Sequence, residues 1–548
     1  MPASPLAEGP ITAILLRIAD RRKRRALTDY DAFLRAATTP PRLLERLSPH
    51  AALRAAHRAR ATVPAYRDFL KRNSWRDNPR LSAAARVRLL PETDKERYIK
   101  AYRTELRCQG GRIPPIGTQI DESSGSSGTP YNWVRSSEEL HEIHHELSQF
   151  SRYLCGQDVI TINGFSMGAW ATGMNVGEAM RAIGIVKSTG PDVDRILHTL
   201  EFFGPEYTYI ITGYPPFLKH LIDEGEARGV DWGRFRIYGF VGGEGMSEGL
   251  RAYLERRFLR VYSGYGASDL DIGVAGELPL TVWVRQHASE NPALARALVG
   301  DDPRLPMVFQ YDPLDYYVET NDARELIVTI NRPNVLSPRI RYNIHDAGGT
   351  VPFERLLGIL RDFRLDPYKE VQRPEQPIFP LPLLYLFGRS DSTISYMGAN
   401  IYPEDVEDAL FEDADDARVL GGFALELLDV GGGEQRVCVH VEADPVPDPE
   451  ALAERLRRRV VEYLVAHNRD FRAAVGEDPS TSQIIVRLHA PGQGPFAGNV
   501  GRIKRRYILK PAEALVAAGV AAPGSSAAHG ASGTSGAPGV PGAPLGGA

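Results

Sequence analysis

The sequence contains few cysteines, and they form no pattern. Cys108, Cys155 and Cys438 are the only three among 548 residues, and no Cys-x-x-Cys pair occurs. An odd number of widely spaced cysteines supports neither a disulfide framework nor a cysteine-rich zinc site. Such sparing use of cysteine fits a reducing compartment, so we predict a cytoplasmic protein.

The sequence also lacks long hydrophobic runs and an excess of basic residues. The apolar run from Ile11 to Leu16 is too short to span a bilayer. Basic residues follow it, rather than a small-residue cleavage site, so we expect neither a signal peptide nor a membrane-spanning segment. The formal net charge is −4, which gives no overall positive field to attract nucleic acid. Local basic runs, such as residues 21–25, are typical of solvated helix faces.

The end of the chain lacks both charge and aromatic rings. No charged residue follows Glu513, and no Phe, Tyr or Trp follows Tyr507. A stretch of Gly, Ala, Pro and Ser cannot bury enough apolar area to offset the entropy of the chain. We therefore predict that residues 518–548 are disordered.

What the remaining sequence contains is typical of an α/β enzyme. Hydrophobic residues make up 43% and charged residues 24%, as in ordinary globular proteins, and the length requires more than one domain. Residues 1–110 have a mainly helical pattern. In residues 111–388, strand-like runs alternate with helical patterns, which predicts an α/β fold. Strands are expected at 158–162, 207–212, 236–241, 258–262 and 325–330, and a helix at 136–153.

A change in composition marks a smaller C-terminal unit. Four prolines occur between Pro374 and Pro382. After them, the pattern predicts a helix at 403–411, strands at 421–428 and 435–442, a long helix at 449–464 and a strand at 483–488. This is an α+β arrangement, and we predict that residues 389–517 form a small mobile lobe on a large N-terminal domain.

The sharpest local signal is a loop rich in hydroxyl groups and glycine. It reads Ser123-Ser124-Gly125-Ser126-Ser127-Gly128-Thr129-Pro130. Free backbone N–H groups and hydroxyls of this kind can converge on phosphate oxygens. The loop is not of the Walker type, because no Gly-Lys-Ser/Thr follows. A plain linker is the alternative, but the loop runs directly into an apolar segment and an amphipathic helix.

Two further glycine motifs follow predicted strands. Gly242 to Gly245 come after one strand, and Tyr262 to Asp269 come after the next. Glycines at strand ends let a ligand approach the backbone closely, although a tight turn is the alternative interpretation. Asp269 offers a carboxylate that suits a divalent cation.

Polar residues complete the set of candidate motifs. Asp346 ends the run Arg339-Ile-Arg-Tyr-Asn-Ile-His-Asp and could bind a ribose diol, or simply form a turn. Gly388-Arg389-Ser390-Asp391 opens the C-terminal unit, and Gly398 to Glu407 follow it. Near the end stands Gly501-Arg502-Ile503-Lys504-Arg505-Arg506, which is either a functional basic turn or a solvated loop.

The order of these motifs is more specific than any one of them. In this order they resemble the adenylate-forming superfamily of acyl-CoA synthetases, luciferases and peptide-synthetase adenylation domains. The phenylacetate–CoA ligase family is the most similar, because the first loop has no lysine after its last glycine and because of the run Gly242–Arg251 and Asn400-Ile401-Tyr402-Pro403. The resemblance covers about residues 110 to 508.

The resemblance implies a role for each matching residue. The loop Ser123–Thr129 would bind the β- and γ-phosphates of ATP, and Ser268 the α-phosphate. Asp269, which replaces the family's glutamate, would hold Mg²⁺, and Asp391 would be the hinge of the small lobe. The adenine and ribose would be bound by Gly243, Glu244, Tyr265, Gly266, Asp346 and Arg389.

One position departs from the family pattern. The family places a lysine between the carboxylate and the α-phosphate, but the matching residue here is Arg502, and the nearest lysine is Lys504. Arginine keeps the charge but is bulkier and forked. Register favours Arg502, and a small shift of the loop would bring in Lys504.

The acid pocket is predicted from aromatic and glycine-rich segments. The segment Asn163–Trp170 and the segment Gly213–Phe217 resemble the family's pocket walls, and aromatic walls suit an aryl acid. The alternative is that these aromatic rings pack in the core. The predicted pocket residues are Gly164, Phe165, Trp170, Tyr214, Phe217 and Gly264.

The function implied by the resemblance is the ATP-dependent activation of a small carboxylic acid, followed by transfer to CoA. One alternative is an adenylating enzyme of secondary metabolism that passes the acyl group to an amine, a carrier protein or a downstream reductase. Another is a nucleotide-binding protein without catalysis. The helical residues 1–110 would either cover the large domain or form a homodimer contact. No nucleic-acid or membrane partner is expected.

Overall fold

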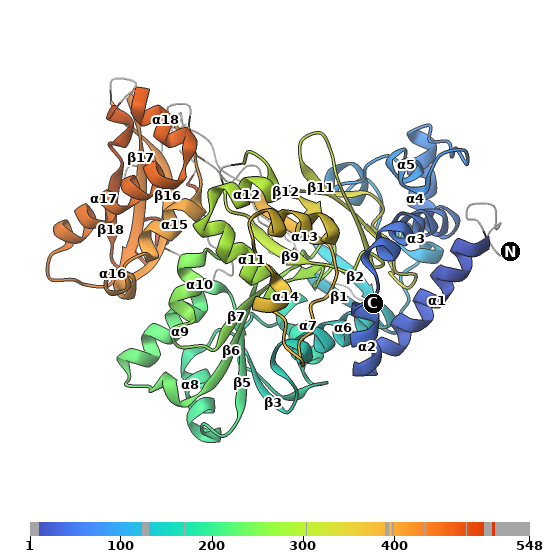
Figure 1. The fold of residues 1–548 in the computed structure, drawn as a ribbon, viewed down its shortest axis with the longest axis horizontal. Helices are drawn as coiled ribbons and strands as arrows, with labels where there is room; N and C mark the ends of the chain where they lie inside the picture. The colour runs from blue at the N-terminus through green and yellow to red at the C-terminus, as the bar shows by residue number, and fades with distance from the viewer. Residues whose placement is uncertain are drawn as a thin grey trace, which may run out of the picture.

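The predicted α/β fold is confirmed. The computed structural model describes residues 10–122, 131–168, 171–302, 304–389, 394–396, 399–431, 434–477, 479–497 and 507–509. A long mixed sheet runs through the molecule, with helices packed against it (Figure 1). Within these residues, every helix is too short or too polar to cross a membrane.

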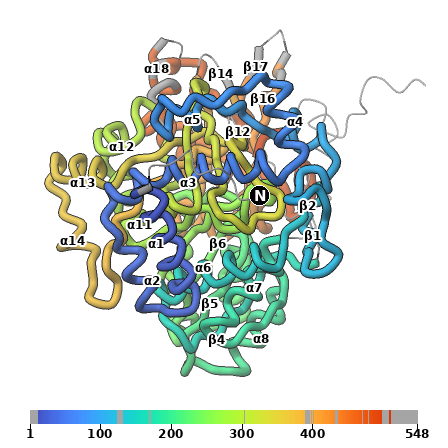
Figure 2. The backbone as a smooth tube through the Cα atoms, turned by 90° about the vertical axis from the view of Figure 1, so that its right-hand side faces the viewer, coloured from blue at the N-terminus to red at the C-terminus, as the bar shows by residue number. Residues whose placement is uncertain are grey.

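The described N-terminal residues, from 10 to 111, are mainly helical. Helix α3 begins with Pro41, which suits the first turn of a helix. Its small residues Ala52, Ala55, Ala56 and Ala59 are buried, so the helix packs closely against the molecule. Figure 2 shows these helices across the side opposite the C-terminal unit. They are α1 (Pro10–Ala26), α2 (Tyr30–Ala37), α3 (Pro41–Thr62), α4 (Pro64–Arg72) and α5 (Ala83–Arg88), followed by short helical turns at Lys95–Ile99, Glu105–Arg107 and Gln109–Gly111.

One half of the main sheet is parallel, and it contains four of the predicted strands. Its members are joined by helices, which is the usual way to connect parallel strands. The strands are β3 (Val159–Asn163), β4 (Gly184–Ser188), β5 (Thr208–Gly213), β6 (Arg236–Gly242) and β7 (Arg260–Tyr265). The helices are α6 (Ser137–Cys155), α7 (Ala171–Met180), α8 (Val193–Phe203), α9 (Pro215–Ala227) and α10 (Glu248–Leu254), with a short turn at Trp232–Arg234.

The other half of the sheet is antiparallel, and most of it was not predicted. The eleven strands follow the order β10-β11-β12-β13-β9-β8-β7-β6-β5-β3-β4. The antiparallel strands are β8 (Ala275–Gly276), β9 (Met307–Gln310), β10 (Tyr316–Thr320), β11 (Glu325–Ile330), β12 (Tyr342–Val351) and β13 (Leu383–Arg389). Helices α11 (Pro279–Glu290), α12 (Pro292–Val299), α13 (Phe353–Asp362) and α14 (Pro367–Glu370) accompany them, and a separate hairpin is formed by β1 (Thr118–Glu122) and β2 (Asn132–Ser136).

The described residues from 394 to 509 form a smaller α+β arrangement, here called the C-terminal unit. It has its own three-stranded sheet and a hydrophobic core that includes Val439, Leu456 and Phe471. Its elements are β14 (Ile394–Tyr396), β15 (Ala399–Ile401), α15 (Pro403–Phe411), α16 (Ala414–Val419), β16 (Leu420–Gly431), β17 (Glu434–Ala443), α17 (Pro449–His467), α18 (Arg469–Glu477) and β18 (Ile485–His489), with short turns at Pro479–Ser482 and Gly494–Phe496. The four segment boundaries drawn from the sequence, and the mobility of this unit, stay predictions.

Helices α10 and α15 join the C-terminal unit to the rest of the molecule (Figure 1). The backbone N–H of Ser247 donates to Glu407 at 3.2 Å, and that of Gly249 donates to Asp408 at 3.0 Å. The carboxylates of α15 therefore satisfy N–H groups at the start of α10, which have no partner within their own helix.

Candidate active site

The predicted site segments follow the ends of neighbouring strands. Strands β3, β5, β6 and β7 are parallel neighbours, so their carboxyl ends lie along one edge of the sheet. Directly after these ends come the segments that the motifs marked, which are Gly164–Phe165, Tyr214, Gly243–Glu244 and Gly266–Asp269. The topology thus brings together segments that are more than a hundred residues apart in sequence.

Gly243 lets an aromatic ring approach the backbone. Its φ angle is +82°, and a Cβ at this position would lie 2.8 Å from the ring of Tyr214. The same ring meets Phe165 edge to face, with centroids 5.4 Å apart. Burial, together with the nearby Glu244 carboxylate, raises the pKa of Tyr214 to about 12, so its hydroxyl stays protonated at neutral pH.

Tyr265 and Asp346 are brought into direct contact. The phenol of Tyr265 donates to Asp346 Oδ2 at 2.8 Å, and the tyrosine is only 7% exposed. Burial, together with the charge of Asp346, raises the pKa of Tyr265 well above its ordinary value, so the tyrosine acts as a donor. Across the sheet, Asp346 on β12 is in register with Arg389 on β13. The two residues predicted to bind a ribose are therefore neighbours.

A tight turn follows β7, and a buried arginine holds it. A Cβ on Gly266 would lie 2.1 Å from the carbonyl oxygen of Ile272, so only glycine fits there. The guanidinium of Arg135 donates to the Ser268 carbonyl at 2.9 Å and to the Leu270 carbonyl at 3.2 Å. Arg135 is only 2% exposed. It fixes the backbone that carries Ser268.

The charge of Arg135 is balanced by two buried carboxylates. Asp121 lies 3.0 Å and Glu139 lies 3.2 Å from its guanidinium nitrogens. Asp121 belongs to the strand that leads into the predicted phosphate loop, and Glu139 lies at the start of α6. One arginine therefore connects the hairpin, the helix and the turn after β7. No motif in the sequence marked it.

Asp269 is oriented by two residues of the Arg339–Asp346 motif. The phenol of Tyr342 donates to Asp269 Oδ2 at 2.8 Å, and Arg339 donates to the Asp269 carbonyl at 2.5 Å. The guanidinium of Arg339 also lies 5.0 Å from the centre of the Trp133 ring. These contacts leave Oδ1 of Asp269 without a hydrogen-bond partner among the described residues.

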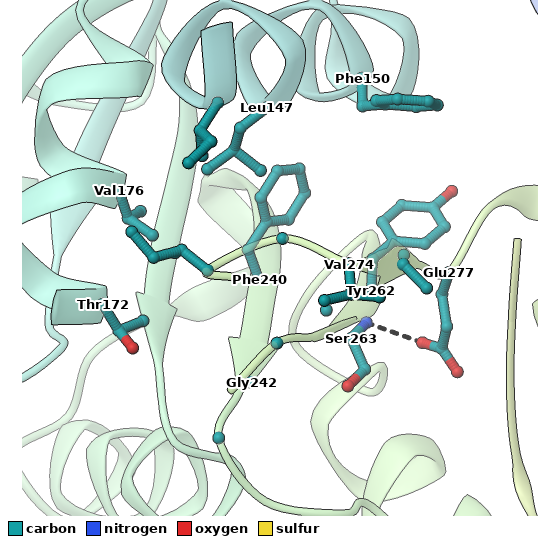
Figure 3. Close-up of a pocket in the computed structure, with 18 of the residues that line it drawn as sticks. Leu147, Phe150, Thr172, Val176, Phe240, Gly242, Tyr262, Ser263, Val274 and Glu277 are labelled. Carbon is teal, nitrogen blue, oxygen red and sulfur yellow. Dashed lines mark hydrogen bonds between the residues drawn. The ribbon is translucent and has the colours of Figure 1, made fainter. Parts of the chain in front are cut away.

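A cavity of about 220 Å³ opens beside these residues. Phe165, Tyr214 and Gly264 line it, and so do Gly243, Gly266 and Ser268. Figure 3 shows Phe240 and Tyr262 pointing from the strands toward Leu147 and Phe150 of α6. Further apolar lining side chains include Ile143, Leu154, Val176, Met180 and Val274.

Two predicted pocket residues lie outside this lining. A Cβ on Gly164 would lie 3.0 Å from the ring of Phe217, and a Cβ on Gly213 would also lie 3.0 Å from it. Phe217 packs with the hydrophobic cluster that contains Ile196 and Leu218. In this structure, Gly164 and Phe217 therefore contribute to the packing beneath the cavity.

Several predicted residues lie outside the described part of the chain. These are Ser123 to Thr129, Trp170, Asp391, Arg502 and Lys504, and the side chain of Arg389 is not described either. The ends of two of these segments do reach the site. Glu122, before the hydroxyl-rich loop, lines the cavity, and the phenol of Tyr507, after the basic segment, donates to Glu244 Oε2 at 3.4 Å.

A second buried arginine explains part of the Gly242–Arg251 motif. Arg251 donates to Glu277 at 2.5 Å and to Glu248 at 3.0 Å, while Glu277 accepts the Ser263 N–H at 2.7 Å (Figure 3). Ser247 caps α10 by accepting the N–H of Leu250. This part of the motif anchors β7 and does not itself face the cavity.

Comparison with known proteins gives a result at the level of the fold. No protein-family model and no curated protein sequence matches the chain. Among solved structures, 2-hydroxyisobutyryl-CoA ligase in the postadenylation state with 2-HIB-AMP is 14% identical, with a TM-score of 0.62 over 88% of this chain and 92% of that one. The chain has the adenylate-forming fold. The complex of the same ligase with R3-HIB-AMP is 13% identical, with a TM-score of 0.61 over the same shares.

A further structure of the same ligase allows two arrangements of its parts to be compared with this chain. The same ligase in the thioesterification state, with 2-HIB-AMP and CoA, is 14% identical but has a TM-score of only 0.50 over 88% of this chain and 92% of that one. Because one enzyme supplies both comparisons, the difference comes from how its parts are arranged. The fold of this chain therefore superposes better on the postadenylation structure of that ligase than on its thioesterification structure.

Proposed function

We propose that the protein uses ATP to convert an aromatic carboxylic acid into an acyl-adenylate, with release of pyrophosphate, and then transfers the acyl group to CoA. The observation that supports this best is the hydrogen bond from Tyr265 to Asp346, because Gly264 and Gly266, the chain neighbours of Tyr265, line a mostly apolar cavity. A polar ribose site would then lie next to an apolar acid site along strand β7. Solved structures of the fold contain R3-HIB-AMP or 2-HIB-AMP, and the thioesterification structure also contains CoA.

The nucleotide would lie along the strand ends. Gly243 and Glu244 would contact one side of the adenine, and Tyr265 with Gly266 the other. Asp346, already oriented by Tyr265, would accept hydrogen bonds from the ribose hydroxyls, together with Arg389. The loop Ser123–Thr129 would bind the outer phosphates, since its neighbour Glu122 lines the cavity.

The positive charge for catalysis would come from the basic segment Gly501–Arg506. The described residues that line the cavity include no Lys, Arg or His. Joining a carboxylate to the α-phosphate needs a cation to stabilise the developing negative charge. Tyr507 contacts Glu244, so Arg502 or Lys504 would enter from a point that is anchored at the site.

The residues present also fit a magnesium ion. Mg²⁺ is usually held by one or two carboxylates together with substrate phosphates. Asp269 offers one carboxylate oxygen that no described residue binds, beside Ser268 at the predicted α-phosphate position. A bound Mg²⁺ would neutralise phosphate charge during the displacement. Asp269 would hold it, and Tyr342 would keep the carboxylate in position.

Acid-dependent exchange of labelled pyrophosphate into ATP tests the first step. We expect exchange with aryl acids such as phenylacetate or benzoate, and thioester formation when CoA is added. Exchange without a thioester would point to an amine or a carrier-protein thiol as the acceptor. Binding of ATP without exchange, for any acid in a broad panel, would contradict the enzymatic function.

The same assay shows whether Arg502 or Lys504 supplies the positive charge. We expect Arg502→Ala to lower exchange by a factor of about 10²–10³, the range for loss of one group that stabilises the transition state. Binding of ATP should change much less, because the loop and the ribose site remain. If Lys504→Ala has the larger effect, Lys504 takes the role instead.

A further inference from the structure

Three neighbouring strands place a glycine at the same position of the sheet. Gly242 on β6 is paired with Gly264 on β7, and Gly264 is paired with Gly276 on β8. Paired residues point to the same face of a sheet. All three glycines line the cavity, so this face has a floor without side chains.

A Cβ on Gly242 would lie 3.2 Å from the Gly264 carbonyl oxygen, whereas Gly264 and Gly276 have open space at the Cβ position. None of the three has a positive φ angle, so other residues could adopt the same backbone. A Cβ on Gly276 would have no atom within 4 Å, and one on Gly264 would meet only the Val241 carbonyl, at 3.9 Å. A side chain at Gly276 would therefore extend into empty cavity.

The rest of the cavity suits a flat, apolar ring. Two residues before the glycines, Phe240 and Tyr262 are paired and point toward Leu147 and Phe150 of α6 (Figure 3). Aromatic side chains beside a flat floor favour stacked or edge-to-face contacts with a planar ring. The volume of about 220 Å³ exceeds the roughly 150 Å³ of an engineered cavity that holds benzene.

Gln310 ends the row of glycines. It is paired with Gly276, and its Nε2 donates to the carbonyls of Phe379 at 2.8 Å and Leu381 at 2.9 Å, which fix the side chain. Gly264 and Gln310 are two strands apart, which is roughly 10 Å. This length exceeds that of one benzene ring, so the floor has room for a second ring or a ring substituent.

We propose that Gly276 determines substrate size and that the acid is a fused-ring or ring-substituted aromatic carboxylic acid. The ring lies on the floor formed by Gly242, Gly264 and Gly276, with its far edge over Gly276 and toward Gln310. This inference rests on the proposed function, because it assigns the cavity to the acid. No motif in the sequence marked Gly276.

Substitution of Gly276 tests the proposal. With pyrophosphate exchange as the assay, the ratio of kcat/KM for 2-naphthoate to that for benzoate is measured in the unchanged protein and in Gly276→Val. We expect the ratio to fall by a factor on the order of 10–200 in the variant, as for the exclusion of small apolar groups from a pocket. Gly276→Ala should give an intermediate ratio. The affinity for ATP should not change.

A matched control separates size from folding. Gly358 on α13 also has open space at its Cβ position, but it does not line the cavity. Gly358→Val should leave the ratio unchanged, and thermal unfolding should show that both valine variants are folded. An unchanged ratio in folded Gly276→Val would overturn the proposal. So would a preference of the unchanged protein for propionate over both aromatic acids.

Direct binding separates this proposal from the proposed function. If no acid supports exchange, the binding of 2-naphthoate is followed by its fluorescence. Binding that Gly276→Val abolishes and Gly358→Val preserves would support the aromatic cavity while the enzymatic function fails. Equal binding by both variants, or none by the unchanged protein, would overturn the proposal.

Discussion

Arg135 contacts several segments of the candidate site through one buried side chain. It is buried with Asp121 and Glu139 and holds the turn that bears Ser268. Removing one partner of a buried ionic group leaves the others unpaired, at a cost of about 3–5 kcal/mol. We expect Arg135→Met to lower the free energy of unfolding by this amount in urea titrations.

A surface arginine provides the control for this prediction. Arg181 forms an exposed ion pair with Glu178 at 3.2 Å. Such surface pairs contribute about 0–1 kcal/mol, so Arg181→Met should hardly change the unfolding curve. Equal effects of the two substitutions would contradict the structural role of Arg135.

The proposed role of the Tyr265–Asp346 pair in nucleotide binding can be tested at the Tyr265 phenol. Tyr265→Phe removes the hydrogen bond that orients Asp346 but keeps the ring. A hydrogen bond of this kind contributes about 0.5–1.5 kcal/mol. If Asp346 binds the ribose, the Kd for ATP should rise about two- to tenfold in calorimetric titrations. Tyr262→Phe, in the cavity wall, should leave that Kd unchanged, and equal Kd values for all three proteins would argue against a ribose role for Asp346.

At the scale of elements, the best sequence predictions were those with strong local signals. Helix α15 begins at Pro403 and ends at Phe411, as predicted, because proline favours the first turn. Strand β11 covers 325–330, as predicted, because a continuous apolar run between polar residues indicates a buried strand. Strand β8 has only two residues, and its pairing depends on β7 and β9, so no local pattern could reveal it.

The residues of the candidate site also divide into those with a local sequence signal and those without one. Motifs marked the segments after the parallel strands, because glycine and polar residues stand out at strand ends. Arg135 and Gly276 were not found, because their roles depend on partners that are remote in sequence. A lone arginine or glycine carries no local signal of what it will contact.

Helix α15 makes the contact between the C-terminal unit and α10 depend on pH. Burial, followed by the charges of Asp408 and Glu404, raises the pKa of Glu407 to about 8. Burial likewise raises the pKa of Asp405 to about 7, with Glu404 and Asp408 adding to the shift. Arg285 and Arg304 are the nearby cations, and they lower the pKa values of Asp408 and Asp405, respectively. Burial of Glu407 and Asp405 therefore favours their protonated forms, while the hydrogen bond from the Ser247 N–H favours the charged form of Glu407.

The sign of the pH effect follows from this shift. A carboxyl group whose pKa is higher in the folded protein contributes full stability below its unfolded pKa, near 4.5, and loses it as the pH rises through about 8. Glu407→Gln keeps an acceptor for the Ser247 N–H but cannot ionise. We expect this variant to match the unchanged protein near pH 5 and to unfold at a higher temperature than it near pH 8.5.

The control for this comparison lies at the end of the same helix. Glu412 follows Phe411 and is exposed, so Glu412→Gln should not change the dependence of the unfolding temperature on pH. Parallel curves for the unchanged protein and Glu407→Gln would show that Glu407 does not titrate in this range.

At the scale of the whole molecule, the proposed function makes the arrangement of the two parts testable. The fold superposes better on a ligase in the postadenylation state than on the same ligase in the thioesterification state. The contacts between α10 and α15 belong to this arrangement. Under the proposed function, weakening them should affect adenylation more than transfer to CoA.

Lys219 offers the sharpest test of this link. It lies on α9, is 2% exposed, and donates to the Leu420 carbonyl of the C-terminal unit at 2.7 Å and to Asp223 at 2.7 Å. Lys219→Met keeps most of the apolar stem but removes the bond across the interface. We expect pyrophosphate exchange to fall about tenfold, corresponding to one charged hydrogen bond of about 1.5 kcal/mol. Thioester formation from a chemically prepared acyl-adenylate and CoA should fall less than twofold. Asp366→Asn, at the start of the exposed helix α14 and away from the interface, should change neither rate. Equal losses in both half-reactions for Lys219→Met would mean that this contact only stabilises the fold, because a bond that serves one arrangement must favour the half-reaction carried out in it.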